Sequence, residues 1–103
     1  MTEKQFENKI KDFLKSLSQT WFFKYWAGPM SKAGIPDIIA CVNGTFVAIE
    51  VKAPNGKPSE LQKRNIRLIQ ECEGLAYILY PKDFEPFKKD MYELLEEGDQ
   101  TAI

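Results

Sequence analysis

Apolar residues recur at helical spacing near the start of the chain and predict an amphipathic helix over residues 2–18. Thr2 is a suitable N-cap, and Glu3 places a negative charge in the first turn, where the helix dipole favours one. The apolar side of this helix should face a core and consists of Phe6, Ile10, Phe13, Leu14 and Leu17.

Two further helices are expected in the second half of the chain. Ser59 and Gln62 fit a capping box at the start of the first one, and Gly74 should end it. Its predicted apolar stripe consists of Leu61, Leu68, Ile69 and Cys72. The second should span residues 82–97, with a frayed tail from Gly98 onward, and its inward positions are Phe84, Phe87, Met91, Leu94 and Leu95.

Four strands are predicted between the helices, over residues 21–26, 37–42, 45–52 and 75–80. Asn43 and Gly44 separate two apolar runs, and this pair is the strongest short signal for a two-residue type I′ hairpin turn. The order is therefore α-β-β-β-α-β-α, which predicts an α/β fold with a small mixed β-sheet and flanking helices. A length of 103 residues suits one domain over residues 1–103.

The register of this hairpin brings charged residues together. With a two-residue turn, Asp37 lies opposite Glu50, and Lys52 lies on the same face two residues further along the strand. Two adjacent carboxylates repel each other, so they need a positive partner, which is either Lys52 or a divalent metal ion. The register alone leaves a salt bridge and a metal site open as alternatives.

Composition limits the chemistry that the chain can perform. It contains no histidine, which excludes Ser/His/Asp triads, Cys/His proteases and His-ligated zinc. Cys41 and Cys72 are too few for a four-cysteine zinc site, and their apolar surroundings predict two core residues. A metal ion in this chain would therefore be bound by oxygen ligands, and these favour a hard cation such as Mg²⁺. No apolar stretch reaches membrane-spanning length and no secretory signal is present, so we expect a cytoplasmic protein without a membrane partner.

Two polar side chains border the predicted apolar stripes. Glu7 lies next to the buried face of the first helix, where it can reach the end of the sheet or remain a solvated charge. Gln62 can serve the capping box, the site beside Glu50, or both.

Positive charge is concentrated in the first part of the chain. Residues 1–67 contain eleven lysines and arginines against six acidic residues, whereas the remainder contains three against nine. Part of the excess gathers around the second helix, at Lys57, Lys63, Arg64 and Arg67. This cluster suits contacts with phosphate groups, and the alternative is a solvated helix face.

The segment Pro36-Asp37, followed after twelve residues by Glu50-Val51-Lys52, resembles the PD-(D/E)xK nuclease signature. More narrowly, the chain resembles the VRR-NUC family of virus-type replication and repair nucleases. The likeness rests on residues 31–37, 50–52 and 59–62 together with Glu7, and it covers nearly the whole chain. It implies a stand-alone domain with a restriction-endonuclease-like core that hydrolyses DNA phosphodiester bonds.

The resemblance also implies a role for each matching residue. Asp37 and Glu50 would bind Mg²⁺, which Mn²⁺ can replace, together with the backbone carbonyl of Val51. Glu7 would reach the ion directly or through water.

Two further roles follow from the same likeness. Lys52 would position or polarise the attacking water, and Gln62 would orient a phosphate, a water or Lys52.

Stand-alone viral-type members of the family resemble Holliday junction resolvases, so the resemblance implies a homodimer that cuts branched DNA in replication, recombination or repair. A virus-encoded protein acting inside a bacterial host fits this likeness. Two alternatives remain: a DNA-structure-binding module on the same fold that does not cleave, and a small interaction protein whose carboxylates form only salt bridges.

Overall fold

The computed structural model describes the backbone of residues 1–101 and the side chains of residues 1–96. The elements follow the predicted order and are α1 (Glu3–Ser16), β1 (Thr20–Lys24), β2 (Ile38–Val42), β3 (Thr45–Val51), α2 (Glu60–Glu71), β4 (Leu75–Leu79), the 3₁₀ turn η1 (Pro81–Asp83) and α3 (Phe84–Thr101). The capping boxes at Thr2 and Ser59 are both formed.

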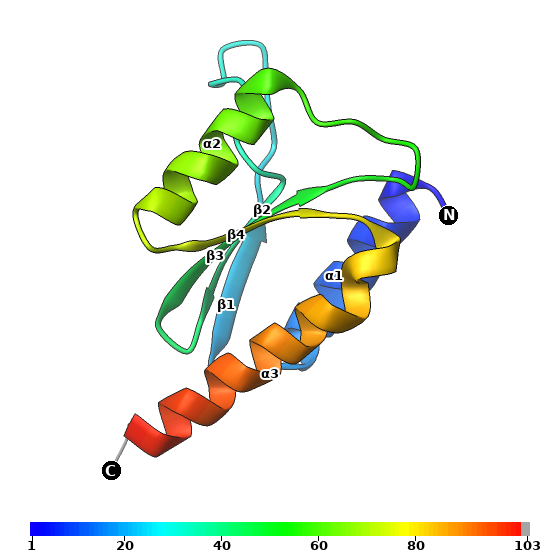
Figure 1. Ribbon diagram of the computed structural model, residues 1–103. Helices are drawn as coiled ribbons and strands as arrows, with labels where there is room; N and C mark the ends of the chain where they lie inside the picture. Colours follow the sequence, from blue (N-terminus) through cyan, green and yellow to red (C-terminus); the bar gives the residue numbers. More distant parts are fainter. Residues whose placement is uncertain (102–103) are drawn as a thin grey trace.

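The four strands form one mixed sheet in the order β1-β2-β3-β4. The first two pairs are antiparallel, whereas β3 and β4 are parallel and α2 connects them. Helices α1 and α3 cover one face of the sheet, and α2 covers part of the other (Figure 1). The predicted α/β class and the mixed sheet with flanking helices are therefore confirmed.

The hairpin has the predicted register, with Val42 opposite Thr45 and Ile38 opposite Ile49. Both turn residues have positive φ, 49° at Asn43 and 87° at Gly44, as a type I′ turn requires. The backbone pairing of β2 with β3 stops at Ile38 and Ile49. Asp37 directly precedes Ile38 in the chain, so it lies just outside the first residue of β2.

Most of the apolar core lies between the sheet and the α1–α3 layer, where Phe6, Ile10, Leu14, Phe87 and Met91 are buried. A smaller core lies under α2 and consists of Ala48, Ile66 and Ala76, with Ile39, Ile69 and Ile78 packed around them. The two cores occupy opposite faces of the sheet, because side chains alternate along each strand.

Helix α2 is oriented differently from the prediction. Ile66 is its buried residue, whereas Leu61 and Leu68 are 49% and 42% exposed. The prediction that Cys41 and Cys72 are core residues was wrong, because both are exposed. The physical reason is that α2 packs on β3 and β4 and leaves the β1–β2 part of that face uncovered.

Several element boundaries also differ from those predicted. Helix α2 ends before Gly74, and the left-handed residue after it is Glu73, with φ 67°. The first strand begins and ends earlier than residues 21–26. The last helix begins after η1 and continues past residue 97 to Thr101, so the predicted fraying from Gly98 is not seen as far as Thr101; residues 102–103 lie outside the described part.

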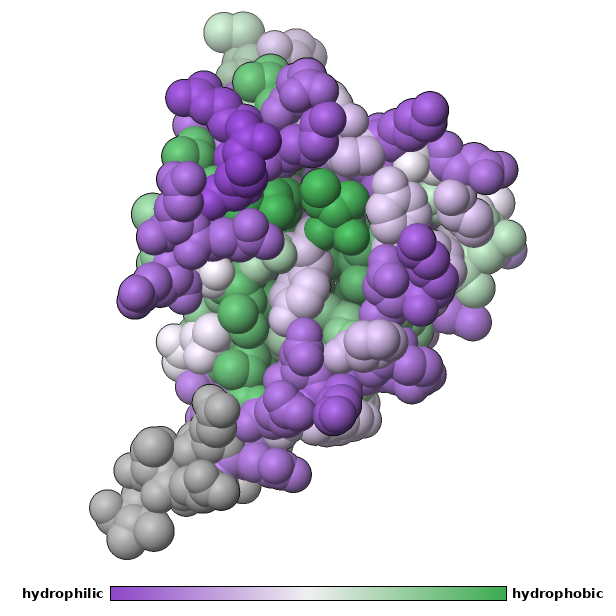
Figure 2. Space-filling model, viewed as in Figure 1, coloured by the Kyte–Doolittle hydropathy of each residue, from purple (hydrophilic) through white to green (hydrophobic). Residues whose placement is uncertain are grey.

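The surface between α2 and α3 is apolar on the side where β4 forms the edge of the sheet. Figure 2 shows green residues in the middle of this face and hydrophilic residues around them. Tyr77 and Ile78 on β4 are half-buried there. Among the described residues, no helix is long and apolar enough to cross a membrane.

Candidate active site

Asp37 is held at the centre of the site by the loop before it and by two strands. Gly34 has φ 80°, which favours glycine, and its carbonyl accepts a hydrogen bond from the side-chain amide of Asn65 at 2.8 Å, so the loop is docked on α2. The backbone carbonyl of Asp37 accepts from the N–H of Tyr25 at 2.8 Å. Its carboxylate Oδ2 accepts from the N–H of Val51, also at 2.8 Å. The carboxylate is thus fixed beside the end of β3.

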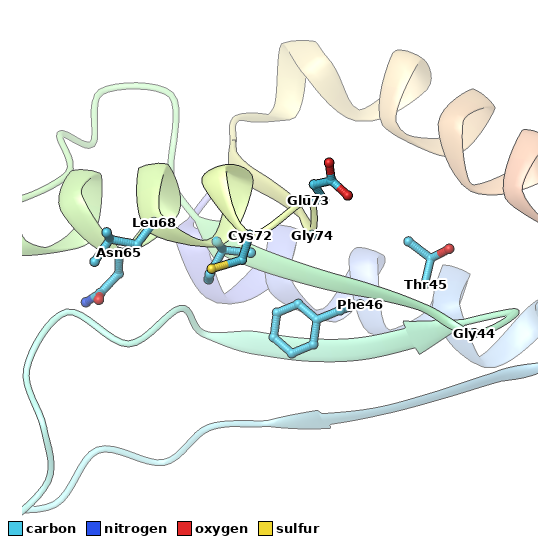
Figure 3. Close-up of a pocket in the computed structure, with 9 residues that line it drawn as sticks. Gly44, Thr45, Phe46, Asn65, Leu68, Cys72, Glu73 and Gly74 are labelled. Atoms are coloured by element: carbon cyan, nitrogen blue, oxygen red, sulfur yellow. The ribbon is translucent and has the colours of Figure 1, made fainter.

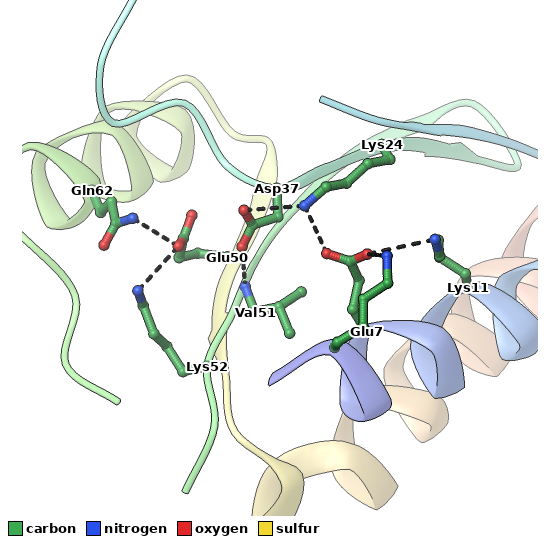
Figure 4. A network of polar contacts seen from close by, with 9 residues as sticks. Glu7, Lys11, Lys24, Asp37, Glu50, Val51, Lys52 and Gln62 are labelled. Carbon is green, nitrogen blue, oxygen red and sulfur yellow. Dashed lines mark hydrogen bonds and ion pairs between the residues drawn. The ribbon is translucent and has the colours of Figure 1, made fainter. Parts of the chain in front are cut away.

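Glu50 is the buried member of the carboxylate pair, with a side chain only 3% exposed. Its Oε2 accepts a hydrogen bond from Nε2 of Gln62 at 2.8 Å and lies 3.3 Å from Nζ of Lys52 (Figure 4). Gln62 also completes the capping box with Ser59, so both of the roles considered for it are structurally compatible. The other oxygen of Glu50, Oε1, is buried and has no hydrogen-bond partner.

The environment of Glu50 disfavours its charged form. Burial raises the pKa of Glu50 to about 7, the negative charge of Asp37 adds to the rise, and Lys52 opposes it. A buried polar oxygen without a hydrogen-bond partner is rare, and its burial costs more free energy when the group is charged. A cation beside Asp37 and Glu50 would satisfy this oxygen and remove the repulsion between the two groups.

Glu7 lies on the other side of Asp37, on α1 (Figure 4). It is 4% exposed, so it is a buried side chain and not a solvated helix charge. Its Oε1 lies 2.6 Å from Nζ of Lys24, and its Oε2 lies 3.5 Å from the ammonium groups of Lys4 and Lys11. Burial alone would raise the pKa of Glu7, but the three lysines outweigh it and hold the pKa below its usual value.

Lys24 is the residue of the site that the sequence did not reveal. Its ammonium group lies 3.5 Å from Oδ1 of Asp37 as well as close to Glu7, so it bridges the two carboxylates. The ring of Trp26 lies 5.6 Å away on its exposed side. The available signal is the register of β1, which places Lys24 opposite Ile38, next to Asp37. That register depends on strand pairing, which no short motif in this segment specifies.

The predicted basic cluster is not in contact with the carboxylates. Lys63 pairs with Glu60 at 2.8 Å, and Arg64 and Arg67 are exposed on α2 within one and a half turns of Gln62. Lys57 is exposed in the loop after β3. Among the described side chains, none of the four forms an ion pair with Asp37 or Glu50, and their role in binding DNA stays a prediction.

The donor set fits a hard divalent cation. Among the described side chains, no three of the His, Cys, Asp and Glu type gather into a metal cluster, so an ion here would also need backbone carbonyl and water ligands. Mg²⁺ is commonly bound in this way, through one or two carboxylates, waters and substrate phosphates. Asp37 and the unpartnered oxygen of Glu50 would supply the carboxylates for such an ion, and the carbonyl of Val51 follows directly in the chain.

The profile of the VRR-NUC domain matches residues 2–83 of the chain. This range contains every carboxylate, lysine and glutamine of the site described above, and it ends at η1, before α3. No curated protein matches the chain.

Replacing Glu50 by glutamine should stabilise the metal-free protein at high pH. Because the pKa of Glu50 rises from 4.5 to about 7 on folding, the free energy of unfolding should fall as pH increases through this window and level off above it. In EDTA, Glu50→Gln should remove this fall, a gain on the order of 2 kcal/mol at pH 8. Urea unfolding between pH 5 and 8 measures it. Glu93→Gln, at an exposed position of α3, should keep the wild-type slope, and a wild type that gains stability towards pH 8 would contradict the burial effect.

Proposed function

Because the chain belongs to the VRR-NUC family of nuclease domains, we propose that it hydrolyses phosphodiester bonds of DNA with a divalent metal ion. The observation that carries this proposal is the carboxylate pair of Asp37 and Glu50, in which Oε1 of the buried Glu50 has no partner although Oε2 lies beside Lys52. A structural salt bridge would be expected to satisfy both oxygens of a buried carboxylate. A module that only binds DNA gains nothing from two carboxylates next to phosphates.

The carboxylates of Asp37 and Glu50 and the carbonyl of Val51 would hold Mg²⁺ or Mn²⁺, with Glu7 joining directly or through water. Such an ion, when bound, activates water at neutral pH and offsets the negative charge that develops on phosphorus. The hydrogen bond from Val51 N–H fixes Oδ2 of Asp37, and Oδ1 lies 3.5 Å from Nζ of Lys24. Gln62 likewise holds Oε2 of Glu50, so the unpartnered Oε1 would be the oxygen available to an ion.

Lys52 would position the attacking water and stabilise the extra charge on the phosphate. Its side chain is 12% exposed and its ammonium group lies 3.3 Å from Glu50, so it is oriented before substrate arrives. The loop at Gly56 packs beside the methylene chain of Lys52, since a Cβ added at Gly56 would lie 3.3 Å from Cδ of Lys52. A positive charge held in this way costs no reorganisation during the reaction.

We also propose that the substrate is branched DNA, such as a Holliday junction, and that the enzyme acts as a homodimer. A two-fold dimer would present two sites to two symmetric strands. Lys57, Lys63, Arg64 and Arg67 would contact the flanking phosphates. The alternative is a module on the same fold that binds DNA structure without cleaving it.

An uncovered apolar surface supports the homodimer. Trp21, Cys41 and Phe46 are neighbours across β1, β2 and β3 on the sheet face beside α2, and all three are exposed. A cavity of about 480 Å³ adjoins this surface at the end of α2, and Phe46 and Leu68 line it (Figure 3). Contiguous exposed apolar surface of this kind marks interaction sites.

Cleavage of labelled four-way junction, flap and linear duplex DNA tests the catalytic proposal. Wild type should cut the junction in Mg²⁺ with paired symmetric incisions and should cut nothing in EDTA. Lys52→Ala should reduce the rate by at least about 100-fold while binding persists, because it removes charge stabilisation made in the transition state. Binding of all three DNAs without any cleavage in Mg²⁺ or Mn²⁺ would instead support the non-cleaving module.

Sedimentation analysis tests the homodimer independently of catalysis. Wild type should sediment as a dimer, and Phe46→Glu should sediment as a monomer because it places a charge in the apolar surface. Lys89→Gln, at an exposed position on α3, lowers the net charge by the same amount and should remain a dimer. A wild type that stays monomeric at all concentrations, alone and with junction DNA, would exclude this assembly.

A further inference from the structure

A second cavity, of about 710 Å³, is lined in part by the loop that follows Lys52 in the chain. It is formed between the loop that follows β3 and the turn that follows β4, two segments that lie near each other in Figure 1. Gly56 belongs to its wall and also contacts the methylene chain of Lys52. A ligand in this cavity would therefore lie close to the side chain of Lys52.

The lining of the cavity has the chemistry of a nucleotide site. Lys57 and Lys82 contribute two ammonium groups, and none of the described residues that line the cavity is acidic, so an anionic ligand is favoured. The ring of Tyr80 and the prolines at 54 and 81 add flat apolar surface on which a base can stack. Asn55 supplies an amide that can both donate to and accept from the edge of a base.

The walls of the cavity are fixed to each other in the absence of ligand. The hydroxyl of Tyr80 donates a hydrogen bond to the carbonyl of Gly56 at 2.9 Å and so ties the turn after β4 to the loop after β3. The N–H of Lys52 donates to the carbonyl of Leu79 at 3.0 Å, which joins the same two segments at their base. A preformed pocket binds its ligand with less loss of entropy than one that must be ordered.

We propose that this cavity binds one unpaired nucleotide of the substrate strand, adjacent to the phosphate that is cleaved. The inference deepens the proposed nuclease function and rests on it for the identity of the strand. A base must leave the duplex stack to enter the cavity, and this costs least where the nucleotide is already unpaired. The pocket therefore supplies a physical basis for preferring branched DNA that carries unpaired nucleotides, such as a flap, over an intact duplex.

Titration of metal-free protein with thymidine 5′-monophosphate and with inorganic phosphate tests the pocket without catalysis. In EDTA, the nucleotide should shift the amide resonances of Asn55, Gly56 and Lys82 and bind at least about fivefold more tightly than phosphate, because stacking adds to the charge contacts. The double variant Lys57→Met/Lys82→Met should weaken nucleotide binding about tenfold. Lys9→Met/Lys89→Met makes the same change in charge at exposed positions of α1 and α3 and should leave binding unchanged.

Equal affinity for nucleotide and phosphate, or resonance shifts centred on α2, would contradict the proposal that this cavity binds a nucleotide. Cleavage by the same variants separates the two proposals. If wild type cuts branched DNA and Lys57→Met/Lys82→Met cuts it with the same KM, the pocket is wrong and the nuclease function stands. If no DNA is cut under any metal condition but the nucleotide binds at the cavity, the nuclease function is wrong and the pocket stands.

Discussion

The burial of a second carboxylate beside Asp37, at the open end of the β2–β3 hairpin, is the constraint on which the rest of the site depends. Glu50 is enclosed by the sheet and α2, and one of its oxygens has no partner. Folding therefore raises the free energy of its charged form, which explains the elevated pKa. Gln62 and Lys52 reduce this cost at the other oxygen only. An unmet requirement for positive charge is what distinguishes this cluster from a structural salt bridge.

The carboxylates on the two sides of Asp37, those of Glu7 and Glu50, are neutralised by lysines to different degrees. On the α1 side, three lysines surround the single carboxylate of Glu7 and hold it ionised. On the α2 side, Lys52 is the partner of Glu50, and the carboxyl group remains partly protonated near neutral pH. A divalent ion would thus be drawn to the Asp37–Glu50 side, while Lys24 already occupies the space between Asp37 and Glu7. With Lys24 in this position, Glu7 would reach such an ion through water and not directly.

The sequence predicted the parts of the site that local rules determine. The turn at Asn43 and Gly44 sets the register of the hairpin, so Asp37, Glu50 and Lys52 could be placed together. The capping box at Ser59 sets the start of α2, but it left open whether Gln62 also reaches Glu50. Lys24 could not be placed, because its position depends on how β1 pairs with β2. The rotation of α2 was also missed, since its apolar residues exceed what the small core beneath it can bury; Leu61, Leu68 and Cys72 are left exposed. Hydrophobic periodicity cannot distinguish a core from an interaction surface.

Proton release on metal binding tests most directly whether the pair of Asp37 and the buried Glu50 binds a cation. Calorimetric titration of the protein with Mn²⁺ in buffers of different ionisation enthalpy counts the protons released for each ion bound. At pH 6, binding should release most of one proton, because Glu50 with a pKa of about 7 must lose its proton to become a ligand. At pH 8.5 the release should be close to zero, and Glu50→Gln should abolish tight binding. Binding at pH 6 without proton release, or unchanged binding by Glu50→Gln, would contradict this assignment.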